Sequence, residues 1–214
     1  MDRIPFAQQA TGACPTHADL ALALAAEFQS PLDEADAALD DLARPMLSVR
    51  SEGPIAQLAA CGEVIEERLE AGDLRWSGIH DLLLDRVVVD GFGHPLALAV
   101  ACVEAGRRAG IELGIVAGQT GCFVAHRELA EPLLIDVADH GRIVDAGGRA
   151  GEVGWQCSHQ TAARILNRIG ERAERTGNIA WALRAAELRL QLPFTRPVRE
   201  DLRHALAHLR ARLN

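Results

Sequence analysis

The chain has 214 residues, of which 49% are apolar, and it carries 22 basic against 30 acidic residues for a formal net charge of −8. This length and apolar content are enough for a real hydrophobic core in one domain of ordinary size with a small addition. No uncharged apolar run reaches about 18 residues and the N-terminus lacks a signal-peptide layout, so we expect a cytoplasmic protein without a membrane span.

The charge is unevenly distributed along the chain. Residues 159–214 hold 11 Arg against 5 acidic residues, a net +6, which leaves 11 basic and 25 acidic residues, a net −14, for residues 1–158. Such an acidic body repels nucleic acid phosphates, so no nucleic-acid partner is expected. The five cysteines form no CxxC pair, which argues against a disulfide framework or a zinc knuckle. The glycine-rich stretches match no phosphate-binding fingerprint, so no cofactor is predicted.

The first half of the chain reads as a set of helices. The expected helices begin at a capping residue, at a proline or at residues able to start a helix, and several end at a glycine or a proline. The expected helical segments are 16–28, 31–45, 54–72 and 77–91. A fifth, buried helix follows within 91–111, entered through Pro95.

The hydrophobic period changes after that buried helix. The stretches 111–118, 122–126 and 132–148 are short, rich in β-branched residues and separated by Gly and Pro, which is typical of strands joined by tight turns. The glycine-rich stretch 145–154 is interpreted as a linker.

The C-terminal part is expected to be helical throughout. A helical hairpin over 160–193, broken at 176–178, precedes a third helix over 195–213, and its Gly and Ala spacing is tetratricopeptide-like. We therefore expect a first domain over 1–150 and a helical tail over 151–214 packed on it.

Five short motifs follow one another through the middle of the chain. They are a leucine-rich segment, a Gly-x-Pro turn, the Arg-Arg to Gly-Ile end of the buried helix, a Gly-Cys-Phe strand and a Leu-Ile-Asp-Val strand, at 82–88, 93–95, 107–111, 121–123 and 134–137. In this order the chain, over about residues 15 to 195, resembles the bacterial SirB-type branch of the transglutaminase-like superfamily. The resemblance implies an α+β fold with a papain-like core, in which a central helix packs on a small antiparallel sheet, followed by an all-helical tetratricopeptide-like tail.

The resemblance also implies where catalytic groups would lie. Enzymes of the superfamily use a Cys at the start of the central helix, a His on the next strand and an Asp that orients this His. In this chain the nucleophile position is Pro95, the base position is Cys122 and the acid position is Asp136. Proline has no nucleophilic atom, so the pattern favours a protein without catalytic activity.

Two arrangements that would give these residues a chemical role stay open as alternatives. Cys122 and His94 could form a transposed dyad oriented by Asp136, or the three residues could join His140 as metal ligands. The spacing matches no metal-site pattern, so no metal is predicted. Cys122 as a small buried residue is the plainer interpretation, and His126 is expected to be solvated.

The sequence therefore favours a non-catalytic protein that binds a protein or peptide partner through a degenerate cleft or through its helical tail. One alternative is a divergent cysteine-dependent acyl transferase or amide hydrolase centred on Cys122. A second alternative is a structural subunit of an assembly, and a homo-oligomer is left open.

Overall fold

The computed structural model describes residues 4–13, 15–72, 78–118, 121–129, 133–145 and 153–212. Its contacts divide the chain into two compact units: a central unit, Leu32–Cys157, and a helical unit made of Met1–Pro31 together with Ser158–Asn214. The first residues of the chain therefore group with the C-terminal helices, which differs from the predicted division at residue 150.

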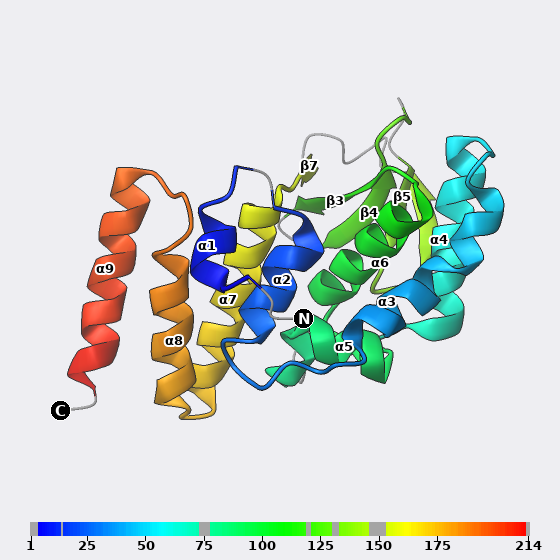
Figure 1. The fold of residues 1–214 in the computed structure, drawn as a ribbon. Coiled ribbons are helices and arrows are strands. Elements are labelled where there is room, and N and C mark those ends of the chain that lie inside the picture. The colour runs from blue at the N-terminus through cyan, green and yellow to red at the C-terminus, as the bar shows by residue number, and fades with distance from the viewer. Residues whose placement is uncertain are drawn as a thin grey trace. The chain divides into compact units, whose positions relative to one another are not determined.

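The fold is α+β with a small antiparallel sheet, as predicted (Figure 1). Its elements in chain order are α1 (Phe6–Ala10), α2 (His17–Ala25), α3 (Ala35–Ala43), η1 (Pro45–Val49), α4 (Pro54–Arg68), β1 (Glu70–Ala71), η2 (His80–Leu82), α5 (Leu84–Asp90), β2 (Phe92–Gly93), α6 (Pro95–Ala109), β3 (Leu113–Gly118), β4 (Cys122–His126), β5 (Leu133–Asp136), β6 (Arg142–Asp145), β7 (Val153–Trp155), α7 (Ser158–Arg175), α8 (Ile179–Arg189) and α9 (Arg196–Ala211).

Five strands of the central unit form one antiparallel sheet in the order β6-β5-β4-β3-β7. The predicted strand regions supply β3 to β6. The fifth strand, β7, was not predicted, because it lies at the end of the stretch interpreted as a linker, most of which falls outside the described residues. A separate parallel pair joins the two-residue strands β1 and β2.

One face of this sheet packs on α6. Successive strand residues point to opposite faces, and the register sets Leu113 opposite His126, and Ile115 opposite Val124. A Cβ on Gly106 of α6 would meet the side chain of Leu113. This row of residues therefore forms the face that α6 covers, which we call the covered face.

The opposite face of the sheet carries its own apolar cluster. It consists of Val116, Phe123, Ala125 and Leu134, all buried, with Val144 packed against them. The two faces therefore both hold buried apolar residues, which explains why the strands read as nearly continuous apolar runs.

Helix α6 begins and ends where the sequence places its signals. Pro95 occupies the first helical turn after the N-cap His94, and Gly110 ends the helix in the left-handed conformation at φ 77°. Nearly every residue of the helix is buried. A helix that is buried on all sides belongs to the interior of a domain, so α6 is the centre of this unit, as Figure 1 shows.

The last turns of α6 are tied to α3 by charge. The carboxylate of Glu104, 4% exposed, accepts hydrogen bonds from Arg107 and from Arg108 at 2.7–2.9 Å. Arg108 also binds the carboxylates of Asp36 and Asp40 on α3. A buried carboxylate held by two guanidinium groups is a stable arrangement only because its charge is fully paired.

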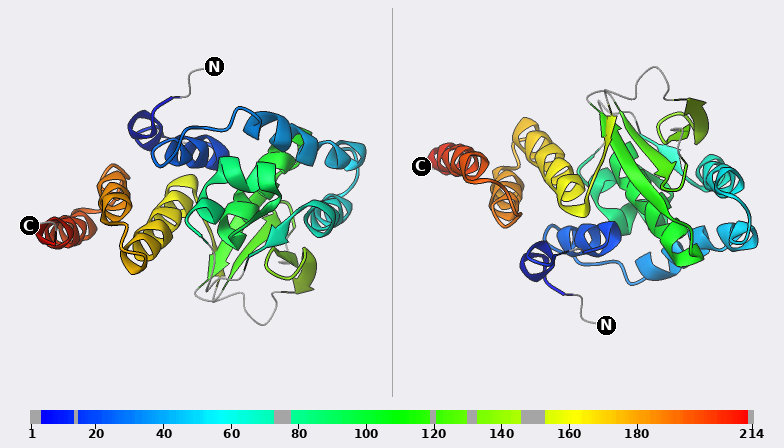
Figure 2. Two further views of the ribbon diagram at one scale, coloured as in Figure 1. Left: turned by 90° about the horizontal axis from the view of Figure 1, so that it is seen from below. Right: turned by 90° about the horizontal axis from the view of Figure 1, so that it is seen from above.

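The helical unit is built on the hairpin that the sequence predicts. Gly177 turns the chain with φ 74°, and the side chain of Asn178 caps α8 by accepting from the amide of Trp181. The helices α7, α8 and α9 lie side by side in that order (Figure 2). Trp181 packs edge-on against Phe28, with ring centroids 5.5 Å apart.

The N-terminal helices belong to this unit because they pack on the C-terminal ones. Helix α2, capped by Thr16 as predicted, contacts α7. The ring of His159 hydrogen-bonds the carbonyl of Ala10 at 3.1 Å, and Arg184 forms an ion pair with Glu27. In the part of the chain that the structure describes, no helix has the length and apolarity needed to cross a bilayer.

Candidate functional site

The start of α6, where a papain-like enzyme would hold its nucleophile, is occupied by groups that build the helix. The backbone amide of His94 donates to the carbonyl of Asp81 at 2.8 Å. The Nδ1 atom of the same residue accepts from the amide of Leu96 at 3.1 Å, which makes the imidazole a helix cap. His94 is 8% exposed. Its Nδ1 atom is therefore already engaged and does not act as a proton acceptor for a thiol.

Cys122 lies at the first residue of β4 and is partly buried. It pairs with Ala117 of β3, and strand alternation places its side chain on the covered face with Val124. The structure therefore puts Cys122 and the start of α6 on the same side of the sheet.

Asp136 does not join that side. It pairs directly with Phe123, the neighbour of Cys122, so its side chain leaves the sheet on the opposite face. Its carboxylate accepts from the amide of Ala138 at 3.0 Å and so stabilises the turn into β6. The strand register therefore separates the acid from the thiol, so Asp136 does not complete the predicted arrangement of Cys122, His94 and Asp136.

The alternative metal site is not assembled either. His140 occupies the turn after β5 in a left-handed conformation, φ 48°. Within the described ranges, no group of three or more His, Cys, Asp or Glu side chains is placed to hold a metal ion.

Two other thiols lie in the interior of the central unit. Cys102 of α6 and Cys61 of α4 are both buried. A hydrogen bond with Cys61, followed by burial, raises the pKa of the Cys102 thiol well above its ordinary value. Since only a thiolate is a strong nucleophile, the buried Cys102 acts as a packing residue.

His126 differs from its prediction. It was expected in solvent, but it ends β4 on the covered face and is 2% exposed. Its Nε2 atom lies 2.8 Å from Oε1 of Gln57 on α4, and its Nδ1 atom accepts from the amide of Glu128. Gln57 in turn donates to the carbonyls of Arg50 and Glu52 at 3.0 and 2.8 Å.

This buried chain of hydrogen bonds fixes the state of the imidazole. Because Nδ1 accepts a hydrogen bond, Nε2 carries the proton and the ring is neutral. Desolvation lowers the pKa of His126 below its ordinary 6.5, against the opposing effect of Glu128 and Glu112. Every polar atom of the ring is occupied, so the group is structural. The signal for it in the sequence was the shared strand parity of His126 and Cys122.

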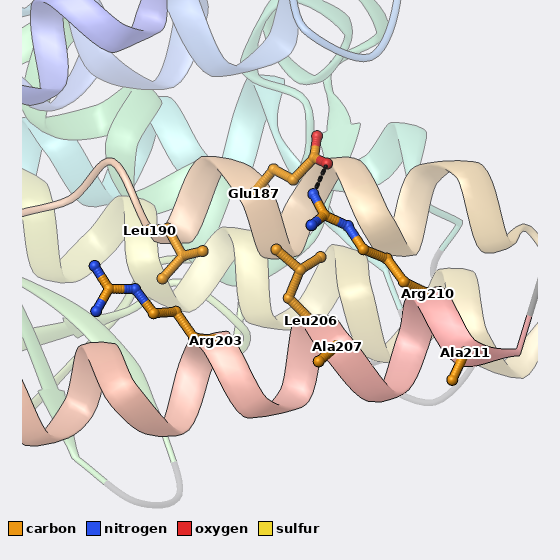
Figure 3. A pocket seen from close by; sticks show the side chains of 7 residues that line it. All are labelled: Glu187, Leu190, Arg203, Leu206, Ala207, Arg210 and Ala211. Carbon is orange, nitrogen blue, oxygen red and sulfur yellow. Dashed lines mark hydrogen bonds and ion pairs between the residues drawn. The ribbon is translucent and has the colours of Figure 1, made fainter.

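The helical unit contains an open groove of about 680 Å³ between α8 and α9. This volume lies in the range of about 300–1,000 Å³ that is usual for ligand sites. Its lining combines an apolar floor with charged side chains, drawn in Figure 3: Glu187, Leu190, Arg203, Leu206, Ala207, Arg210 and Ala211.

Two faces of α9 explain how the groove arises. Leu202, Leu206 and Leu209, at helical spacing, are buried. The adjacent stripe of Arg203, Ala207, Arg210 and Ala211, at i, i+4, i+7 and i+8, stays exposed and lines the groove. The small side chains of Ala207 and Ala211 leave the space beside the arginines open.

The charged groups of the groove are not equivalent. Arg210 donates to the carboxylate of Glu187 on α8 at 2.9 Å. Arg203 is exposed, and in the described part of the chain its guanidinium group has no hydrogen-bond or ion-pair partner. The packing of α9 on α8 makes these arginines the rim of a groove.

Comparisons with known proteins add no relative to this picture: no family model, no curated protein and no solved structure matches the chain.

Proposed function

We propose that this chain is a non-catalytic protein that binds a segment of a protein or peptide partner in the groove between α8 and α9. The observation that carries the proposal is the groove itself. It combines an apolar floor with charged residues at its rim, and this is the composition expected of a peptide-binding surface.

The central unit supports the non-catalytic part of the proposal. Pro95 supplies no nucleophile at the start of α6, Nδ1 of His94 is engaged as a cap, and Asp136 lies on the other face of the sheet from Cys122. We further propose that the fold is a degenerate transglutaminase-like one in a cytoplasmic protein. Its support is the antiparallel sheet with α6 packed on one face, which is the arrangement that the resemblance implies.

Peptide selection on the full-length chain tests the binding function. A display library of random peptides is panned on the wild-type protein, and the selected peptides are synthesised and titrated against variants. Ala207→Trp fills the groove with an exposed bulky side chain. Ala205→Trp, at an exposed position of the same helix outside the lining, is the matched control.

We expect Ala207→Trp to weaken binding at least about tenfold, since it occupies the volume that the ligand needs, and we expect Ala205→Trp to leave it within about twofold. Selection of no peptide would contradict the proposal. Equal binding to wild type and to Ala207→Trp would contradict it as well, because the ligand would then lie elsewhere.

A further inference from the structure

We infer that the segment bound in the α8–α9 groove is acidic: a carboxylate side chain of the partner pairs with Arg203 while a neighbouring apolar side chain packs over Leu206. This inference rests on the function proposed above and adds the chemistry of the partner. It starts from the unequal state of the two arginines at the groove.

The positive charge of Arg203 is not balanced by Glu187, the acidic residue that lines the groove, because Glu187 pairs with Arg210. Arg210 and Glu187 neutralise each other across the two helices at 2.9 Å. Arg203 lines the same groove, is exposed, and is without an ion-pair partner in the ranges that the structure describes. A ligand with a negative group near Arg203 would therefore complete the groove electrostatically, whereas a positive group there would be repelled.

The position of Arg203 relative to the apolar floor defines what else the ligand carries. Arg203 and Arg210 are separated by two helical turns, about 10.5 Å along α9, and Leu206 lies between them (Figure 3). The neighbouring Ala207 has a small side chain, so an apolar side chain of the partner can reach Leu206. A fitting segment therefore carries an Asp or Glu close to a large apolar residue.

The charge of the surrounding helices points the same way. Residues 179–212 contain seven Arg and three acidic residues, and Arg184 and Arg212 pair with Glu27 and Glu174 from outside this stretch, which leaves a net +2. A guanidinium group binds a carboxylate through two parallel hydrogen bonds, which gives geometric selectivity as well as attraction.

A nucleic acid suits this surface less well. Single-stranded nucleic acids are bound by rows of cations together with aromatic platforms for the bases. The seven lining residues of the groove include no aromatic side chain and one unpaired arginine. We therefore assign the groove to a carboxylate-bearing protein segment.

The test uses the full-length protein and the peptides that were selected on it. Each selected peptide is made in three forms: as found, with its acidic residues changed to Gln, and with them changed to Lys. All three are titrated against wild type, Arg203→Glu and Arg196→Glu. Arg196 is an exposed arginine of α9 outside the groove lining and serves as the charge-matched control.

We expect the selected peptides to be enriched in acidic residues, and the Gln forms to bind wild type about threefold to tenfold more weakly. Arg203→Glu should weaken the acidic form about tenfold and should prefer the Lys form. The gain of the Lys form also shows that the variant is folded. Arg196→Glu should change binding by less than about twofold, and added salt should weaken the acidic form most.

The outcomes separate this inference from the proposed function. If peptides lose binding on Ala207→Trp but are not acidic, or bind Arg203→Glu as well as wild type, the acidic partner is refuted while the groove function stands. If no peptide depends on the groove, both fail. The inference is also overturned if Arg203→Glu abolishes binding of a single-stranded oligonucleotide instead, or dissociates a self-associated form of the chain.

Discussion

Replacing Gln57 by leucine would test whether the buried hydrogen-bond chain around His126 stabilises the central unit. The change removes three hydrogen bonds, to the carbonyls of Arg50 and Glu52 and to the imidazole, all between 2.8 and 3.0 Å. At about 1 kcal/mol net for each hydrogen bond, the free energy of unfolding falls by about 3 kcal/mol. The imidazole N–H, left in the interior without its acceptor, increases this loss further. The added apolar contact of leucine offsets part of this, so we expect a loss of about 2–4 kcal/mol.

Hydrogen exchange of the β4 amides at increasing denaturant measures this loss within the central unit alone, which matters because the chain has two compact units. The double variant Gln57→Leu with His126→Phe serves as the matched control, since it removes both partners of the buried pair and should recover part of the lost stability. A loss below about 1 kcal/mol for Gln57→Leu would refute the reasoning.

The same group predicts how stability depends on pH. The pKa of His126 is lower in the folded protein than its unfolded value near 6.5. Between the folded and the unfolded pKa, the imidazole is protonated in the unfolded chain and neutral in the folded chain. The contribution of His126 to the free energy of unfolding is therefore complete above about pH 6.5 and is lost as the pH falls through the folded pKa. Comparison with His126→Gln isolates the effect from the titration of carboxylates. Identical pH profiles for the two proteins would contradict the assignment.

Two further predictions concern the central unit. In the folded protein an alkylating reagent should label the partly exposed Cys122, whereas Cys61 and Cys102 should be labelled only after unfolding. Site-resolved mass spectrometry identifies the labelled residues. Labelling of Cys61 or Cys102 in the folded protein would contradict their packing role. Gly141→Ala should lower the free energy of unfolding by about 2–4 kcal/mol in denaturant titrations, because the residue has φ 74° and its Cβ would collide with backbone of α4, whereas Gly53→Ala, where a Cβ has open space, should have little effect.

The helical elements follow from local signals that the sequence carries directly. Thr16 caps α2, Pro95 starts α6, and Gly177 with Asn178 separates α7 from α8, each as predicted. Helix caps and helix-breaking residues act over three or four residues, so they can be recognised without knowledge of the rest of the chain. Elements with weak local signals were missed, among them the short helix α1 and the three-residue strand β7.

The candidate catalytic residues show why the site itself was less predictable. The sequence places Asp136 on a strand, as the structure does, but the face of its side chain depends on the register between β4 and β5, and a shift by one residue reverses it. His126 was assigned to solvent because the sequence does not show that α4 covers the end of β4. The resemblance to transglutaminase-like proteins, and with it the papain-like core, remains a proposal.

The sequence by itself determined the helical and strand periods, the caps, the acidic body with its basic C-terminal part, and the proline that starts α6. Only the tertiary structure decided that Cys122 and Asp136 lie on opposite faces, that Gln57 buries His126, and that Arg203 borders a groove. The physical reason is the sequence separation of the residues that interact. Periodicity and capping are set by neighbouring residues, whereas the face on which a strand residue lies, its burial and the grooves arise from the packing of segments that are distant along the chain.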